Sequence, residues 1–450
     1  MVFLHNDKNG LGEKNMWSDS SIFYQIYPLG FCGAPKENDG IPVPRIRKVI
    51  DWILHIKNTG FDAIYFSPVF ASDRHGYDTR DYTQIDPRLG RNEDFADVCR
   101  ALHDSHIRVV IDGVFNHVGR GFAQFRDVIE NREASPYKDW FFIRFHENNG
   151  YNDGLSYEGW EGHYEMVKLN LRNPQVVEYL FACISGWVKE FDIDGIRLDV
   201  AYCLDEEFLS RLRSFCNQIK PDFFLLGEVL FGDYNRLVND GKLHSCTNYE
   251  CAKGLYSSFN DQNMFEISYS LNRQFGPNDP LYKGLKLLSF ADNHDLTRLA
   301  SVLKEPRHLP LLYTMMFSMP GIPCVYYGSE WGEKGEKHPG SDDELRPNFE
   351  YPIQNELSIL IRKLANIHKN TEALCQGGFR NIFVGNRQYA FARELGSQRI
   401  IFTVNSDSKA GVIRLGENMT QVKDLVSGEI LNLNSEWEAA PLEAHIFEVI

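Results

Sequence analysis

Short apolar runs alternate with amphipathic stretches through most of the chain. Residues 63–66 (AIYF) and 108–115 (RVVIDGVF) have the length and composition of buried strands, whereas residues 92–106 and 174–191 have the spacing of helices that face a core. Further strands are predicted at 22–27, 195–200, 223–229, 285–290 and 324–327, and further helices at 46–57 and 206–219. About eight strand–helix units fit between residues 17 and 372, which predicts a closed parallel barrel rather than an open sheet.

Two segments depart from this alternation. About 80 residues separate the strand ending near 115 from the strand starting near 195, against roughly 30 for an ordinary unit. We therefore predict an inserted domain at 118–170, on a loop that faces the active end of the barrel. Residues 376–450 alternate short strand-like runs with turn signals, which predicts a small antiparallel β domain. The barrel then comprises 17–117 and 171–375, preceded by a leader at 1–16.

Composition narrows the class of protein. Of 450 residues, 43% are hydrophobic and 24% charged, as in soluble globular proteins. The net charge of −15 disfavours binding to a phosphate backbone, so no nucleic-acid partner is expected. No apolar run is long enough for a membrane span, and the first residues lack a secretory signal. Nine cysteines without a pairing or metal-binding pattern predict free thiols in the cytoplasm.

Charged and imidazole side chains follow four of the predicted strands. The segments are 112–117 (DGVFNH), 195–201 (GIRLDVA), 227–229 (GEV) and 290–295 (FADNHD). Because the carboxyl ends of barrel strands meet at one face, Asp199, Glu228 and Asp295 should lie close together. Three adjacent carboxylates repel one another, and burial raises the pKa of at least one. Such a set suits a divalent metal, or acid–base chemistry on a sugar or phosphate.

Two neighbouring positions separate the roles of these carboxylates. Arg197 and Asp199 point to the same side of a strand, so the guanidinium should keep Asp199 ionised, as a nucleophile requires. Glu228 follows an apolar strand, which suits an acid that stays protonated near neutral pH. A carboxylate nucleophile and a carboxylic acid about 5–5.5 Å apart are the components of a retaining glycosidase.

The four motifs in this order resemble glycoside hydrolase family 13, the α-amylase family. Residues 75–90 (HGYDTRDYTQIDPRLG) and 321–332 (GIPCVYYGSEWG) are also similar to family motifs, so the resemblance covers about 17–450. It implies an α/β fold, a (β/α)8 TIM barrel with an inserted B domain after the third strand and a C-terminal antiparallel β-sandwich. It also implies a retaining α-glycosidase that hydrolyses α-1,4-linked gluco-oligosaccharides by double displacement, with cyclodextrins and α-1,6 linkages as further substrates.

The resemblance assigns roles to individual positions. Asp199 matches the family nucleophile, Glu228 the general acid/base and Asp295 the stabiliser of the transition state. Asp112 is expected to support the site rather than react. The resemblance assigns substrate binding to Tyr77, His117, Arg197, His294, Asp342 and Arg346.

Some segments indicate a subgroup. Residues 135–142 (SPYKDWFF) and 166–170 (MVKLN) resemble neopullulanases, cyclomaltodextrinases and maltogenic amylases, although Val167 departs from the subgroup's MPKLN. Those relatives carry an N-terminal domain that forms a dimer. Because about sixteen residues precede the barrel here, we expect a monomer or a dimer that does not use such a domain. Tyr202 and Cys203 replace the Lys-His pair of endo-amylases, which favours short maltodextrins or cyclodextrins.

No cofactor is predicted. Family calcium sites commonly use the asparagine matched by Asn116, but the insert offers no convincing partners and the first βα loop lacks an Asp/Asn-rich segment. Two other functions stay open. A glucan transferase would use the same covalent glycosyl-enzyme with a sugar as acceptor. A non-catalytic sugar-binding relative is disfavoured because all three carboxylates are present.

Overall fold

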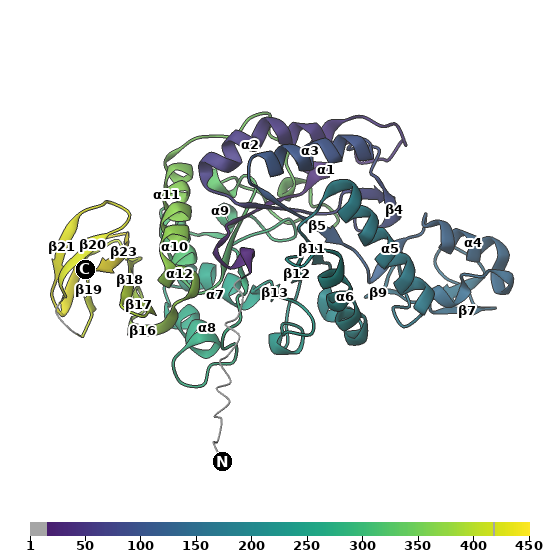
Figure 1. Cartoon of the computed structure of the whole chain (residues 1–450). Coiled ribbons are helices and arrows are strands. Elements are labelled where there is room, and N and C mark those ends of the chain that lie inside the picture. Colours follow the sequence, from purple (N-terminus) through teal and green to yellow (C-terminus); the bar gives the residue numbers. More distant parts are fainter. Residues whose placement is uncertain (1–15, 417–418) are drawn as a thin grey trace, which may run out of the picture.

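The computed structural model describes residues 16–416 and 419–450, and its centre is the predicted parallel barrel (Figure 1). The predicted leader lies outside the described residues except for Met16. A single parallel bridge between Thr247 and Leu288 joins the two ends of the eight-stranded sheet and closes the barrel. The barrel strands are β1 (Phe23–Ile26), β2 (Ala63–Phe66), β5 (Arg108–Gly113), β11 (Gly195–Leu198), β12 (Phe224–Gly227), β13 (Ser245–Cys246), β14 (Leu288–Ser289) and β15 (Ile322–Tyr326).

Helices surround the barrel, and two of them, α5 (Pro174–Phe191) and α6 (Glu206–Ile219), begin at recognisable signals. Pro174 occupies the first turn of α5, where no backbone donor is needed, and the Asn173 side chain accepts a hydrogen bond from the Gln175 amide. The Asp205 side chain caps α6 in the same way. The main covering helices are α2 (Lys48–Thr59), α3 (Asn92–Asp104), α5 (Pro174–Phe191), α6 (Glu206–Ile219), α7 (Tyr249–Asn260), α8 (Phe265–Phe275), α10 (His308–Ser318) and α11 (Glu356–Asn370).

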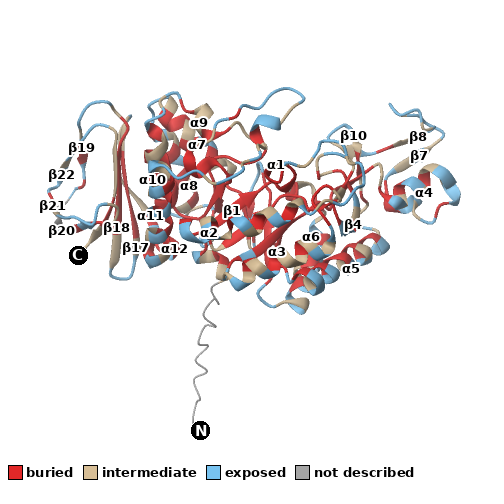
Figure 2. Ribbon diagram, turned by 90° about the horizontal axis from the view of Figure 1, so that it is seen from above, coloured by how far each residue is buried: buried red, intermediate tan, exposed pale blue. Residues whose placement is uncertain are grey.

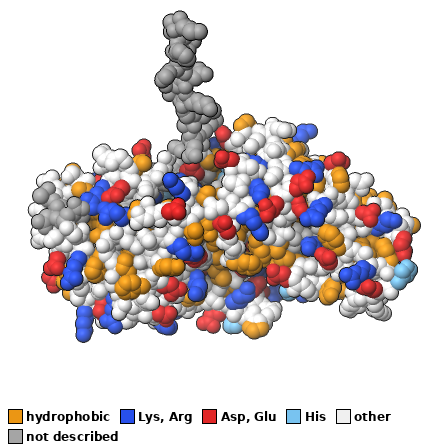
Figure 3. Space-filling model, turned by 90° about the horizontal axis from the view of Figure 1, so that it is seen from below, with side chains coloured by type: hydrophobic (Ala, Val, Ile, Leu, Met, Phe, Trp, Pro, Cys, Tyr) orange, Lys and Arg blue, Asp and Glu red, His pale blue; other side chains and the backbone are white. Residues whose placement is uncertain are grey.

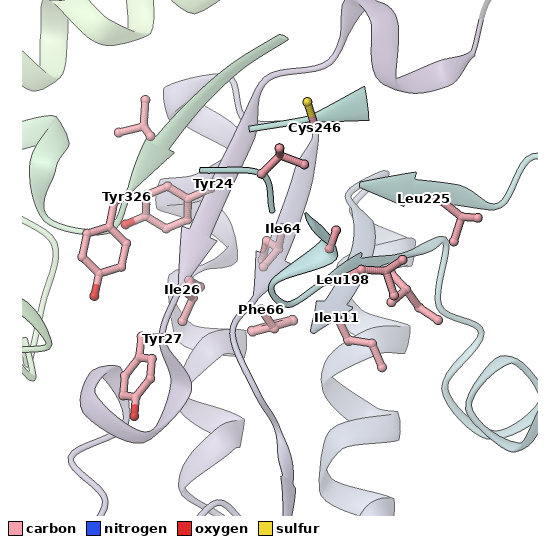
Figure 4. Packing of buried hydrophobic residues seen from close by; sticks show 14 of the residues in the cluster. Tyr24, Ile26, Tyr27, Ile64, Phe66, Ile111, Leu198, Leu225, Cys246 and Tyr326 are labelled. Atoms are coloured by element: carbon pink, nitrogen blue, oxygen red, sulfur yellow. The ribbon is translucent and has the colours of Figure 1, made fainter. Parts of the chain in front are cut away.

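Successive strand residues divide between two cores, because their side chains point to opposite faces of the sheet. The outward residues pack against the helices, as Tyr24, Ile64 and Leu198 do in Figure 4. The inward residues form a separate cluster that fills the barrel, and Trp17 closes its lower end against Phe224 with ring centroids 5.5 Å apart. The interior is therefore a packed core, and polar chemistry is confined to the carboxyl ends of the strands.

The segment after the third barrel strand forms a small unit of its own. Strand β10 (His163–Lys168) pairs antiparallel with β6 (His117–Gly119) and with β9 (Gly159–Trp160), while β7 (Ile143–Phe145) pairs with β8 (Leu155–Tyr157). Helix α4 (Ala123–Asn131) packs on these strands through Phe125, which contacts Phe141 and Tyr157. Much of the aromatic content of this segment therefore forms its core. The boundaries 118–170 stay a prediction.

The C-terminal segment forms two antiparallel sheets around an apolar cluster that includes Ile401, Ile413 and Phe447. Helices α10 and α12 (Glu372–Gln376) pack against the larger sheet, and the buried Arg393 donates hydrogen bonds to the carbonyls of Ser318 and Gly377. The larger sheet has the order β16 (Gly378–Val384), β17 (Gln388–Leu395), β18 (Gln398–Asn405), β23 (Glu443–Val449), β20 (Met419–Asp424) and β21 (Ile430–Leu433); the smaller pairs β19 (Gly411–Arg414) with β22 (Glu436–Ala439).

Buried residues concentrate in the barrel strands and on the inner faces of the helices (Figure 2). On the face shown in Figure 3, acidic and basic side chains are interspersed, so the negative net charge is not gathered there in one patch. None of the helices in the described part of the chain combines the length and the apolar composition needed to cross a lipid bilayer.

Replacing Phe224 by alanine should destabilise the protein strongly. The side chain is fully buried inside the barrel, and such truncations cost about 3–5 kcal/mol. Phe265, which is 50% exposed on α8, provides the matched control, and its replacement by alanine should change stability by about 0.5 kcal/mol or less. Urea midpoints measured by circular dichroism compare the two. Equal shifts would show that the barrel interior is not the dominant core.

Candidate active site

One guanidinium connects three carboxylates at the carboxyl end of the barrel. Arg197 lies opposite Asp112 in the register of β11 and β5, and its Nη1 is 3.0 Å from Asp112 Oδ2. The same nitrogen is 2.9 Å from Asp199 Oδ1. Its Nη2 is 2.8 Å from Glu228 Oε1, on the loop that directly follows β12. All four side chains are buried, so strands far apart in sequence converge on Arg197 as the topology predicts.

Burial and an excess of negative over positive charge together set the protonation of this cluster. With all three carboxylates ionised, one guanidinium would leave an excess of two negative charges in a buried site. Burial raises the pKa of Asp112 to about 6, although Arg197 opposes the shift. Burial also raises the pKa of Asp199, and the carboxylates of Glu228 and Asp112 add to this effect. The Arg197 contact alone therefore does not keep Asp199 ionised, and the cluster retains a proton at mildly acidic pH.

Asp295 occupies a different electrostatic environment across the site. Its Oδ2 is 3.0 Å from His294 Nε2, and its Oδ1 is 3.1 Å from Arg346 Nη2. Arg346 also contacts Asp342 at 2.9 Å, as the four-residue spacing suggests. Burial alone would raise the pKa of Asp295, but the contacts with His294 and Arg346 outweigh it and hold that pKa well below its usual range. The site thus combines an ionised carboxylate with a group that holds a proton, which is the arrangement acid–base chemistry needs.

The remaining predicted residues line the same site. The Tyr77 ring stacks on the His294 ring with centroids 5.5 Å apart, and its hydroxyl lies 3.2 Å from Asp112 Oδ2. His117 Nε2 is 3.9 Å from Asp199 Oδ2 and, among the described residues, makes no hydrogen bond although it is buried. Burial lowers the pKa of His117 to about 3, so the ring is neutral. A neutral, unpaired ring nitrogen beside Asp199 can hydrogen-bond a ligand hydroxyl.

Three contacts in the site involve residues that the sequence did not single out. Tyr249 donates a hydrogen bond to Glu228 Oε1 at 3.4 Å and accepts one from Asn293 at 2.8 Å. Gln25 Nε2 lies 2.8 Å from His294 Nδ1. Gln25 had a detectable signal, because it is the polar residue of the otherwise apolar run 22–27. Tyr249 could not be found in this way, because it follows the two-residue strand β13, which the hydrophobic pattern did not reveal.

Asn116, the asparagine considered as a calcium ligand in the sequence analysis, contacts the neighbouring histidine. Its Nδ2 lies 3.1 Å from His117 Nδ1, and its backbone carbonyl accepts a hydrogen bond from the Leu169 amide. Within residues 16–416 and 419–450, no group of three or more His, Cys, Asp or Glu side chains is arranged to hold a metal ion. Asn116 therefore links the barrel to the insert through contacts within the chain.

Comparisons with known proteins agree on one family. Residues 25–373 match the family model described as Alpha amylase, catalytic domain. A cyclomaltodextrinase from a Bacillus species is 32% identical over 419 residues, which cover 88% of this chain and 75% of that protein. An intracellular maltogenic amylase from Bacillus subtilis is 30% identical over 456 residues, or 95% of this chain and 74% of that protein. A solved cyclomaltodextrinase structure covers 96% of this chain and 78% of its own, with a TM-score of 0.82 and 28% identity.

Replacing Asp112 by asparagine should alter how stability depends on pH. The folded protein holds a proton on Asp112 up to about pH 6, whereas the ordinary carboxyl value is 3.8. Between these values the folded state binds more protons, so the Asp112 contribution to the unfolding free energy falls as pH rises, by up to about 3 kcal/mol. Urea titrations give the unfolding free energy of each protein. The wild-type value minus the variant value should decrease as the pH rises from about 4 to about 6. A constant difference would contradict the raised pKa.

Proposed function

The chain belongs to the alpha-amylase family, and we propose that it is a retaining glycosidase that hydrolyses α-1,4-linked gluco-oligosaccharides. The observation that carries this proposal is the contact of one buried guanidinium with both Asp199 and Glu228, while Asp295 faces them as an ionised carboxylate. These three groups supply a nucleophile, a proton donor and a negative charge within one site, as a double displacement requires.

The reaction proceeds in two displacements. In the first, a Glu228 proton passes to the glycosidic oxygen as its bond to the anomeric carbon breaks, and an Asp199 oxygen bonds to that carbon. In the second, Glu228 takes a proton from water, whose oxygen displaces Asp199. Two inversions give retention, and the ionised Asp295 stabilises the positive charge that develops on the sugar.

The binding residues follow from the same geometry. The Tyr77 ring provides an apolar surface for the sugar at the cleaved bond, and His117 offers its unpaired nitrogen to a hydroxyl of that sugar. Arg346 and Asp342, which contact each other next to Asp295, extend toward the neighbouring sugar on the side away from the cleaved bond, the −2 position. Short and cyclic maltodextrins are the proposed substrates. The names of the relatives and the Tyr202–Cys203 pair support this choice.

We also propose that the protein functions in the cytoplasm. All nine cysteines are free thiols, and eight of them are buried, which suits a reducing compartment. The intracellular maltogenic amylase among the relatives supports the same location.

Replacing Asp199 by asparagine should lower kcat/KM on maltotriose by about 10³-fold or more, because the first displacement loses its nucleophile. Asp261→Asn, at an exposed helix end, is the matched control and should keep wild-type activity. The test also measures the sizes of the products and uses NMR to observe the anomeric form of the first product. An active Asp199→Asn variant or a first product of inverted configuration would exclude this mechanism. Products longer than maltotriose would identify a transferase instead.

The proposed displacements use only carboxylates of the chain, so we expect no cofactor requirement. Dialysis against EDTA should leave kcat/KM on maltotriose within about twofold of the untreated value, a change of about 0.4 kcal/mol or less. The same sample after addition of calcium serves as the control. Activity that disappears with EDTA and returns with calcium would show that a metal site supports this fold.

A further inference from the structure

The residue that follows the proposed nucleophile has an unusual backbone conformation. Val200 has a φ of 40° and a ψ of 48°, in the left-handed region that β-branched side chains rarely adopt. Among the non-glycine residues with positive φ in residues 16–416 and 419–450, Val200 alone is β-branched. Such conformations persist only where the surrounding structure holds them, and they concentrate at functional sites. The contacts of Val200 therefore indicate what its conformation is for.

The left-handed conformation turns the Val200 amide from a backbone acceptor to a side chain. Strands β11 and β12 are parallel, and the Glu228 amide donates a hydrogen bond to the Leu198 carbonyl at 2.9 Å. In a regular parallel ladder the next donor, the Val200 amide, would bond the backbone carbonyl of Glu228. It donates instead to Glu228 Oε2, at 3.0 Å, in a buried contact. The strand pairing therefore ends in a bond from the backbone to the proposed acid/base.

Each oxygen of the Glu228 carboxyl group thus has a donor of its own. Oε1 lies 2.8 Å from Arg197 Nη2, and Oε2 accepts the hydrogen bond from the Val200 amide. A single donor would leave the carboxyl group free to rotate about its Cγ–Cδ bond, whereas two donors fix its plane. The amide of Val200 belongs to the planar peptide group that it shares with Asp199. The peptide group of the nucleophile therefore sets the orientation of the proton donor.

Packing around the turn holds the amide in this position. The Cys203 amide donates a hydrogen bond to the Val200 carbonyl at 2.8 Å, which closes the turn. A Cβ atom at Gly227 would lie 3.0 Å from the Ala201 Cβ atom, closer than side chains normally pack. Glycine directly before Glu228 therefore lets the turn approach that strand end closely. Val200 itself is buried, so the unfavourable conformation is enclosed on all sides.

We propose that Val200 is a positioning residue for proton transfer: its left-handed backbone aims its N–H at Glu228 and fixes the plane of that carboxyl group. The inference rests on the proposed glycosidase function, in which Glu228 gives a proton to the glycosidic oxygen and later takes one from water. Proton transfer depends first on the geometry of the donor and acceptor. A rotated Glu228 carboxyl group therefore slows both transfers, while the attack by Asp199 is unaffected.

Replacing the amide of Val200 by an ester in the full chain tests this role. Incorporation of α-hydroxyisovaleric acid keeps the valine side chain and removes only the N–H. The kcat/KM on maltotriose, whose leaving group needs a proton, should fall about tenfold or more, as expected for a hydrogen bond to a charged group. The kcat/KM on α-maltosyl fluoride should change about twofold or less, because fluoride departs with little need of protonation. A general structural defect would lower both values.

Val109 provides a matched control for the ester. Its amide also donates to a buried carboxylate, Asp194 Oδ2, at 2.9 Å, but this bond lies at the amino end of the barrel. The same ester at Val109 should leave kcat/KM on both substrates within about twofold of the wild-type values. Val200→Gly keeps the N–H and adopts the left-handed conformation without strain, so it should keep the ratio of the two kcat/KM values. Thermal melting shows whether each variant is folded.

Crystal structures of the wild-type protein and of the Val200 ester add a measurement that does not need turnover. The Glu228 carboxyl group should rotate in the ester, while the contact of Arg197 with Asp199 stays. Equal losses on both substrates, or an unchanged ratio, would overturn the positioning role and leave the proposed function in place. A wild-type protein that cleaves neither substrate, but whose Glu228 rotates in the ester, would contradict the proposed function and keep the positioning role.

If the Val200 ester does not fold, NMR of the full chain with isotope-labelled valine decides the outcome. The amide resonance of Val200 should shift in the Glu228→Ala variant, because its acceptor is removed. The amide resonance of Val109 should stay in place, because its acceptor is Asp194. An unmoved Val200 resonance would overturn the inference.

Discussion

The contact of Arg197 with three carboxylates is the constraint on which the site depends. Two buried carboxylates from neighbouring strands would repel each other, and the guanidinium between them makes their approach favourable. Its planar fork holds Asp199 with one nitrogen and Glu228 with the other, which fixes their relative positions before a substrate arrives. The excess of negative charge then keeps a proton in the cluster. Arg197 therefore sets the positions of the carboxylates, whereas burial and their mutual repulsion raise the pKa of Asp112 and Asp199.

The sequence predicted the convergence of this site because barrel topology makes it independent of the intervening chain. Asp199, Glu228 and Asp295 each follow a recognisable apolar strand, and parallel strands of a closed barrel end on one face whatever length separates them. Helices α5 and α6 were predicted to the residue, since Pro174 and the capping Asp205 mark where they begin. Capping residues and barrel topology together were therefore sufficient to predict these two helices and the convergence of the three carboxylates.

Other features could not be predicted because they depend on contacts between distant residues. Strand β13 has two ladder residues, too few to produce a hydrophobic pattern, and Tyr249 was missed with it. In the C-terminal domain, apolar runs at 389–392, 400–404, 411–415, 430–433 and 444–450 predicted five strands, but β16, β20 and β22 were missed. The raised pKa of Asp199 arises from burial and from the Glu228 and Asp112 carboxylates, so the adjacent Arg197 gave an incomplete picture. In each case the feature depends on residues that are distant in the sequence and adjacent in the folded protein.

The way in which the barrel closes affects which substitutions the protein can tolerate during evolution. Strands β5, β11 and β12, which carry Arg197 and its partners, are joined by ladders of four residue pairs each, whereas one bridge joins Thr247 to Leu288. Substitutions near that bridge disturb few backbone hydrogen bonds, while substitutions in the ladders disturb many. The wall between β13 and β14 is therefore where evolutionary substitutions disturb the backbone pairing of the barrel least. The ladders that position Arg197 and its partners stay intact when that wall varies.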